Sequence, residues 1–159
     1  MKKSILVIAI ALFSSIVIAQ AKTTVEIPKK VSEAFSAKYP SAEIKKWKTA
    51  KGDYVAEFNL EKKKFLAHYS AGGEWIKTES KIKLSNNLPD AVKEGLHKSE
   101  YASWYINEIK QVEKPGHNIY TIHVHDGNKL SADHHDALKT DFLLSFNDTG
   151  ELIKKQRLH

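Results

Sequence analysis

The sequence predicts an α+β fold of two tandem repeats, each with one helix followed by a four-stranded antiparallel sheet. A run at residues 73–77, Gly-Glu-Trp-Ile-Lys, returns at 150–154 as Gly-Glu-Leu-Ile-Lys. An Ile-Pro-x-x-Val run at 27–31 returns as Leu-Pro-x-x-Val at 88–92. In both copies a helical apolar period gives way to the two-residue period of strands. A supersecondary unit written twice predicts the construction of the fold before any chemistry is considered.

Each repeat is expected to begin with a helix. Pro28 stands at a favoured opening position, and Pro40 marks the end because the residue before a proline avoids the α region. Pro89 opens the second helix. The apolar stripe recurs at an offset of 61 residues: Val31, Ala34 and Phe35, then Val92, Gly95 and Leu96. Gly95 costs roughly 1 kcal/mol relative to Ala in a helix, so we expect it to permit close packing on the sheet.

Strands follow each helix, because apolar and polar residues begin to alternate, as in Tyr54, Ala56 and Phe58. The expected strands are residues 43–50, 54–59, 65–69 and 75–80, then 105–113, 120–124, 142–146 and 151–157. The helices are expected to pack on one face. We expect the sheets to form one antiparallel surface with an open second face, and a separate core in each repeat is the alternative.

Two connections between strands stand out. The Glu-Lys-Lys-Lys run at 61–64 is expected at a hairpin tip, as an ordinary solvated turn. The step from Phe58 to Phe65 is 7 residues, whereas the equivalent step from Val124 to Phe142 is 18. The second repeat therefore carries an 11-residue insertion within residues 126–140. Long loops on a regular scaffold often carry function, so we expect function there.

The first 21 residues are expected to be a signal peptide. Lys2 and Lys3 precede an apolar run at 5–19, and Ala-Gln-Ala at 19–21 is a small-x-small cleavage site. The run is shorter than the ~20 residues of a membrane span, so we expect a periplasmic or secreted protein without a membrane anchor. Residues 22–159 are then a single domain of two repeats, about 27–81 and 88–159.

Charge and composition exclude several function classes. The formal charge of +6 falls to +4 once Lys2 and Lys3 are removed, and the lysines are interspersed with acidic residues. We therefore expect no nucleic-acid binding. The chain has no Cys, which excludes disulfides and thiol catalysis. It also lacks a nucleophile elbow, a phosphate-binding glycine loop and a zinc-protease helix, so we expect no enzyme.

A set of apolar, aromatic and turn residues runs through the first repeat: Ile27, Pro28, Val31, Ala34, Phe35, Lys38, Tyr39, Pro40, Trp47, Tyr54, Phe58, Tyr69, Gly73 and Trp75. This set resembles the PepSY-like family, also described as β-lactamase-inhibitor-like. The resemblance covers the mature chain once per repeat and is looser in the second, where Leu152 replaces Trp75. It implies a small exported module whose sheet faces a partner protein, and it supplies no catalytic residues.

Two groups of side chains are candidate sites. Trp47, Trp75 and Trp104 are candidate partner-binding residues, since Trp is enriched at interface hot spots, and packing in the core is the alternative for each. The second group is a histidine cluster on a predicted strand and in the insertion: His123, His125, His134 and His135. On a strand, His123 and His125 share a face with Cα atoms about 6.5–7 Å apart.

Imidazoles suit zinc or copper, although a solvated polar loop and a pH-responsive surface are the alternatives. The leading hypothesis is an exported, non-enzymatic binding module without a cofactor. It presents a sheet face and the inserted loop to a protein or peptide partner, and inhibition of that partner is left open. The alternative is a periplasmic protein that binds zinc, copper or a small ligand through its His-rich strand and loop.

Overall fold

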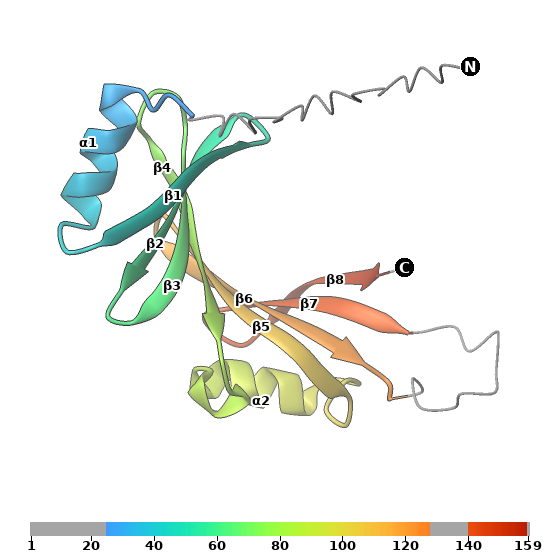
Figure 1. The fold of residues 1–159 in the computed structure, drawn as a ribbon. Coiled ribbons are helices and arrows are strands. Elements are labelled where there is room, and N and C mark those ends of the chain that lie inside the picture. The colour runs from blue at the N-terminus through green and yellow to red at the C-terminus, as the bar shows by residue number, and fades with distance from the viewer. Residues whose placement is uncertain (1–24, 128–139, 159) are drawn as a thin grey trace, which may run out of the picture.

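The computed structural model describes residues 25–127 and 140–158, which form one eight-stranded antiparallel sheet and two short α-helices (Figure 1). The elements in chain order are α1 (Lys29–Lys38), β1 (Glu43–Ala50), β2 (Asp53–Leu60), β3 (Lys63–Tyr69), β4 (Trp75–Ile82), the 3-10 helix η1 (Ser85–Asn87), α2 (Asp90–Lys98), β5 (Tyr105–Lys114), β6 (His117–His125), β7 (Asp141–Asn147) and β8 (Leu152–Leu158). The strands lie in the sheet in their order along the chain, from β1 at one edge to β8 at the other.

The predicted fold class, α+β with a four-stranded sheet in each of two repeats, is wrong. Strand β4 pairs with β5 from Thr78 opposite Glu113 to Ile82 opposite Ile109, so a single sheet crosses the boundary between the expected repeats. The helices are only ten and nine residues long, and the protein is mostly β. The physical reason is that two separate sheets would each leave two edges unpaired, and joining β4 to β5 satisfies one edge of each.

Both helices pack on the same face of this sheet, beside its two halves (Figure 1). Cross-strand partners share a face, and one such row contains Phe65, Ser80, Gln111, Tyr120 and Phe146. The α1 cluster consists of Val31, Phe35, Ala56, Phe58, Ala67 and Tyr69. The α2 cluster consists of Leu88, Val92, Tyr101, Ile109, Tyr120, Ile122, Val124, Leu144 and Phe146. The core is therefore divided into two clusters, with polar side chains between them.

The repeated Gly-Glu run lies where each hairpin turn meets its helix. A Cβ on Gly73, which has φ +90°, would lie 2.8 Å from the backbone oxygen of Lys30. A Cβ on Gly150, with φ +81°, would lie 2.0 Å from the backbone oxygen of Ala91. In α2, a Cβ on Gly95 would lie 1.9 Å from the Gly150 oxygen. The echo thus marks two close helix–hairpin contacts, and Gly95 does permit close packing, against the last hairpin.

Two expected features lie outside the described residues. The predicted signal peptide at 1–21 is one of them, and most of the predicted insertion, residues 128–139, is the other. Within the described part of the chain, neither helix combines the length and the apolar character that crossing a membrane requires.

Candidate functional site

The face of the sheet opposite α1 and α2 has no helix over it in the described parts of the chain (Figure 1). We call it the open face. Its central row of cross-strand partners contains Lys46, Glu57, Leu66, Glu79, Val112 and Ile119. A neighbouring row contains Lys81, Lys110, Thr121, Ser145 and Lys154. These two rows contain charged, polar and apolar side chains on a face that no described helix covers.

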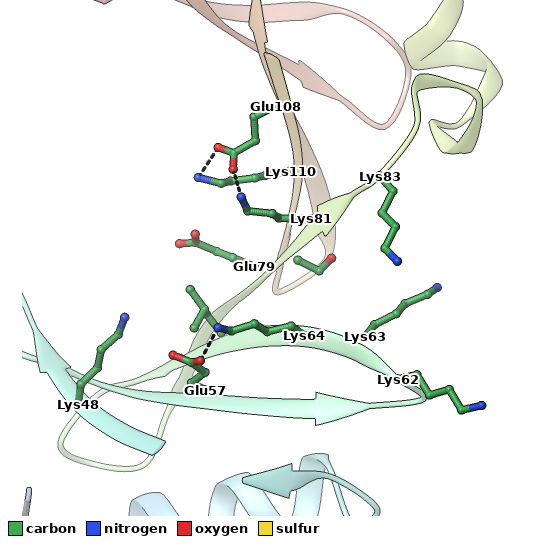
Figure 2. A pocket seen from close by; sticks show the side chains of 12 residues that line it. Lys48, Glu57, Lys62, Lys63, Lys64, Glu79, Lys81, Lys83, Glu108 and Lys110 are labelled. Atoms are coloured by element: carbon green, nitrogen blue, oxygen red, sulfur yellow. Dashed lines mark ion pairs between the residues drawn. The ribbon is translucent and has the colours of Figure 1, made fainter. Parts of the chain in front are cut away.

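A hollow of about 610 Å³ lies on this face, between the hairpin tip that joins β2 to β3 and the paired strands β4 and β5 (Figure 2). Seven lysines and three glutamates are the charged residues that line it: Lys48, Lys62, Lys63, Lys64, Lys81, Lys83 and Lys110 with Glu57, Glu79 and Glu108. Leu66 completes the lining together with Ser80, which belongs to a row of the helix face. We call this site the lysine hollow. Its formal charge is strongly positive although the chain as a whole is only mildly basic.

The glutamates of the lysine hollow are already engaged. Glu57 pairs with Lys64, and Glu108 pairs with Lys81 and, at 2.9 Å, with Lys110 (Figure 2). The hydrogen bonds from Lys110 and Lys81 hold the pKa of Glu108 below its usual value. Burial raises the pKa of Glu79, but a hydrogen bond of 2.5 Å from Lys77 and the positive charges of Lys77 and Lys110 together outweigh burial, and the pKa is lowered. All three carboxylates are therefore ionised at neutral pH.

Four lysines of the hollow form no ion pair with any described residue: Lys48, Lys62, Lys63 and Lys83. Lys62, Lys63 and Lys83 are exposed, and their side chains extend along one rim of the hollow (Figure 2). Unpaired ammonium groups gathered in one concave site raise the local concentration of anions. The lysine hollow therefore has the electrostatic character of an anion-binding surface.

The hairpin tip at this rim has a strained backbone. Glu61 and Lys62, between β2 and β3, have φ of 50° and 63°. Two-residue turns with positive φ at both positions strongly prefer Asn-Gly or Asp-Gly, and a left-handed non-glycine residue costs roughly 1–2 kcal/mol. The preceding hairpin follows the preference more closely, because Gly52 occupies its second position. Charged side chains are thus kept at the rim where glycine would be more stable.

His68 is the most buried histidine side chain in an ion pair on the open face, with 13% exposure. Its Nδ1 lies 3.6 Å from Asp53 Oδ2, and its Nε2 lies 3.5 Å from Glu79 Oε1. Burial lowers the pKa of His68, the positive charge of Lys77 lowers it further, and the two carboxylates oppose this shift only in part. The imidazole is therefore neutral at pH 7, next to a glutamate of the lysine hollow.

We expect acidification to destabilise the protein from about pH 6.5 downward. The unfolded chain protonates His68 near its ordinary pKa of ~6.5, whereas the folded chain resists protonation because its pKa is lowered. The unfolded state then binds more protons, so the free energy of unfolding falls as the pH drops. Urea unfolding at pH 7.5, 6.5 and 5.5 measures this. His68→Asn should reduce the dependence of the free energy of unfolding on pH between 7.5 and 5.5. His97→Asn, on the exposed surface of α2, should leave it unchanged. Equal pH dependence in the His68→Asn variant and the wild type would show that His68 does not cause the loss of stability.

The three candidate tryptophans lie on the helix face, Trp47 and Trp75 against the α1 cluster and Trp104 against the α2 cluster. Trp47 packs edge-on against Phe35, with ring centroids 5.5 Å apart. Trp104 packs in the α2 cluster against Tyr101, at 5.0 Å. Trp75 packs in the α1 cluster, where Lys38 Nζ lies 3.6 Å from its ring centroid. All three are partly buried, and their role in partner binding stays a prediction.

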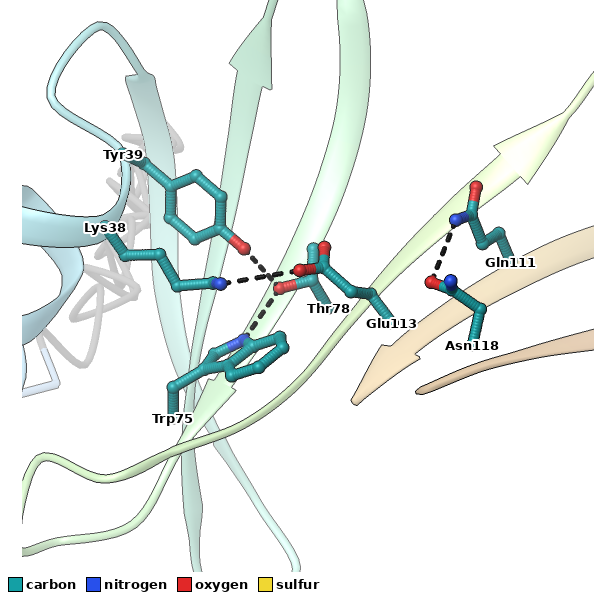
Figure 3. A network of polar contacts seen from close by, with 7 residues as sticks. All are labelled: Lys38, Tyr39, Trp75, Thr78, Gln111, Glu113 and Asn118. Carbon is teal, nitrogen blue, oxygen red and sulfur yellow. Dashed lines mark hydrogen bonds and ion pairs between the residues drawn. The ribbon is translucent and has the colours of Figure 1, made fainter. Parts of the chain in front are cut away.

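Trp75 also belongs to a polar network between the two clusters (Figure 3). Its Nε1 donates to Thr78 Oγ1 at 2.9 Å, and the Tyr39 hydroxyl contacts the same oxygen at 2.5 Å. Lys38 Nζ lies 3.4 Å from Glu113 Oε1, which links α1 to β5. This network ties the first helix across the β4–β5 junction, so we assign it a structural role.

The candidate histidines are only partly described. His123 Nε2 lies 3.5 Å from Asp141 Oδ2. His125 stacks on Tyr105, with centroids 5.3 Å apart, and its Nδ1 accepts a hydrogen bond from the Gly127 backbone N–H. His134 and His135 lie outside the described residues. Among residues 25–127 and 140–158, no three His, Asp or Glu side chains are grouped to hold a metal. The zinc or copper site stays a prediction.

Sequence reasoning missed the lysine hollow. The run at 61–64 is indeed a hairpin tip, but it also forms one wall of the site. Lys81, in β4, and Lys83, directly after the strand ends at Ile82, are the signal that was present, because a two-residue spacing along an extended chain puts two side chains on one side. Lys110 joins them only through the pairing of β4 with β5, which local pattern does not indicate.

Comparisons with known proteins agree on the fold. The family model described as "Putative beta-lactamase-inhibitor-like, PepSY-like" matches residues 20–66 and 52–154. A crystal structure of a BLIP-like protein from Bacteroides fragilis is 22% identical, with a TM-score of 0.72 over 84% of this chain and 88% of that one. A DUF2874 family protein from Bacteroides uniformis is 23% identical, with a TM-score of 0.71 over 82% and 88%.

A third crystal structure, described as "a putative periplasmic proteins from Bacteroides eggerthii", is 22% identical, with a TM-score of 0.70 over 84% of this chain and 90% of that one. At these identities the likenesses establish the fold alone. No curated protein matches the chain.

Proposed function

This chain belongs to the PepSY-like, β-lactamase-inhibitor-like family, and on that premise we propose that it is an exported, non-enzymatic binding module that presents its open face to a protein or peptide partner. The observation that carries the proposal is the lysine hollow, a concave charged site of about 610 Å³ on a sheet face that the helices leave uncovered. The predicted insertion at 126–140 is part of the proposal as a second contact.

The construction of the fold supports this reading. Every buried apolar side chain of the described residues except Val55 belongs to one of the two clusters on the helix face, so most of the open face is available for a partner. Every neighbouring pair of strands is hydrogen-bonded, so the open face is a continuous platform. Rigid platforms bind with a smaller loss of conformational entropy than flexible ones. We further propose that docking on this face inhibits an exported enzyme.

Export is supported by two observations of different kinds. The first 21 residues have the pattern of a signal peptide. The protein of the same fold from Bacteroides eggerthii is described as periplasmic. A partner is therefore expected among exported proteins.

Site-specific photo-crosslinking tests the proposal. The chain contains no Cys, so a single introduced Cys carries a unique photoreactive label. We choose Thr121→Cys on the open face and Ser36→Cys on the exposed surface of α1 as the matched control. In an extract of exported proteins, the label at Thr121 is expected to join one defined partner and the label at Ser36 none. A crosslinked product from the label at Ser36 alone, or no specific product from either site, would contradict the proposal.

A further inference from the structure

We propose that the lysine hollow docks an acidic polypeptide segment, an extended stretch or loop of the partner that carries several Asp or Glu side chains. The inference rests on the proposed function and adds the chemistry of the partner. It follows from three features of the site: uncompensated charge, a strained basic rim, and carboxylates built into the wall.

The first feature is positive charge that the described residues do not compensate. Seven lysines line the hollow against three glutamates, and Lys48, Lys62, Lys63 and Lys83 form no ion pair with the described residues. Like charges held in one concave site repel each other, and that repulsion is relieved when an anionic partner enters. A segment bearing carboxylates at several positions is complementary to this surplus.

The second feature is the strained rim. Lys62 has φ 63° and directly precedes Lys63, and both side chains line the hollow. A glycine at position 62 would adopt this backbone without strain. Strained residues concentrate at functional sites, where the surrounding structure holds them in place. The strain therefore points to a role for the Lys62 ammonium group that glycine could not supply.

The third feature selects a polypeptide over a polyphosphate. Glu57, Glu79 and Glu108 place three ionised carboxylates in the wall of the hollow. A chain with a charge on every unit would meet these carboxylates and be repelled. A peptide separates its carboxylates by neutral backbone and apolar side chains, so it can place them at the unpaired lysines and an apolar side chain near Leu66.

Fluorescence anisotropy tests the inference on the full mature chain. The probe is a labelled octapeptide in which Asp and Glu alternate with Gly and Leu, and its Asn/Gln counterpart is the uncharged control. The hollow variant is Lys63→Glu/Lys83→Glu. The matched variant is Lys30→Glu/Lys51→Glu, two exposed lysines outside the hollow and outside the rows of the open face, with the same change in net charge. Circular dichroism and thermal unfolding verify that both variants fold.

We expect saturable binding of the acidic peptide, none of the uncharged one, and weakening at higher salt. The hollow variant should bind at least about tenfold more weakly, and the matched variant within about twofold of the wild type. Lys62→Gly should raise the thermal midpoint by a few degrees, because it relieves the strained turn, and still weaken binding about two- to threefold. A Lys62→Gly variant that is more stable but binds the peptide more weakly would show that the Lys62 side chain serves binding and not stability.

Three outcomes would overturn the inference. Equal weakening in the hollow and matched variants would mean non-specific attraction. Inorganic polyphosphate that binds more tightly than the peptide, and displaces it, would mean a phosphate site. No binding of the peptide, together with a crosslinked partner at Thr121 whose contacting segment is not acidic, would reject the acidic occupant and leave the proposed function intact. Peptide binding without any crosslinked partner would reject the proposed function and leave the chemistry of the hollow intact.

Discussion

Replacing Gly95 by Ala is expected to destabilise the protein by about 3 kcal/mol, although Ala is the better helix former by roughly 1 kcal/mol. The added Cβ would lie 1.9 Å from the backbone oxygen of Gly150 and 2.9 Å from its carbonyl carbon. Neither atom belongs to a flexible side chain, so α2 or the β7–β8 hairpin must move. Urea unfolding measures the loss, and the thermal midpoint should fall by about 10 °C.

The control for this prediction is Gly72→Ala. Its Cβ would meet only Ser70 Oγ at 3.5 Å, an ordinary contact, and Gly72 has no positive φ. We expect a change within about 0.5 kcal/mol. A Gly95→Ala variant as stable as the wild type would show that α2 and the last hairpin are not packed as closely as described.

Replacing Thr78 by Val is expected to cost about 2–3 kcal/mol, because it keeps the shape of a buried side chain and removes its hydroxyl. Thr78 is 4% exposed. Trp75 Nε1 would lose its acceptor and the Tyr39 hydroxyl would lose its partner. The Tyr39 hydroxyl is buried enough that its pKa is raised, so water cannot readily replace the lost contact. Chemical denaturation measures the cost, with Thr49→Val on exposed β1 surface as the neutral control.

A double-mutant cycle separates the two lost contacts. Removing both partners of a buried hydrogen bond costs less than removing one. Tyr39→Phe added to Thr78→Val should therefore cost less than the sum of the two single changes. Strict additivity would indicate that the Tyr39–Thr78 contact contributes nothing, and that the loss comes from Trp75 alone.

The strands of this protein were accessible to local reasoning, because side-chain alternation depends on neighbours in sequence. The alternation of Tyr54, Ala56 and Phe58 lies within β2, and those residues are buried or half-buried on the helix face. Turn residues behaved in the same way: Gly73 and Gly150 both have positive φ at hairpin turns. The family resemblance carried by the motif residues was also correct.

Pairing between distant strands was less accessible. The incorrect expectation of a separate four-stranded sheet in each repeat arose because the residue pattern of 75–82 does not indicate whether the far edge of that strand is free or paired. Strand β5 follows η1 and α2 in sequence, yet it lies directly beside β4. The lysine hollow depends on that pairing, since Lys81 and Lys110 are opposite one another in register. A site assembled from strands on both sides of a helix cannot be found from either strand alone.

The candidate tryptophans illustrate the same limit for side chains. Trp75 has an apolar ring and one polar atom, so sequence alone allows both an exposed hot spot and a buried ring with a partner. The structure provides both a partner, Thr78, and a cation, Lys38, over the ring.

The amino-acid sequence by itself determined the positions of the helices and strands, the glycine turns and the family, because these depend on the conformational preferences of adjacent residues. Only the tertiary structure decided that β4 pairs with β5 in a single eight-stranded sheet, that Gly95 meets Gly150, and that lysines from four strands and a hairpin tip surround one hollow. These features depend on the pairing of unsatisfied strand edges and on close contact between distant backbones, which are properties of the folded chain.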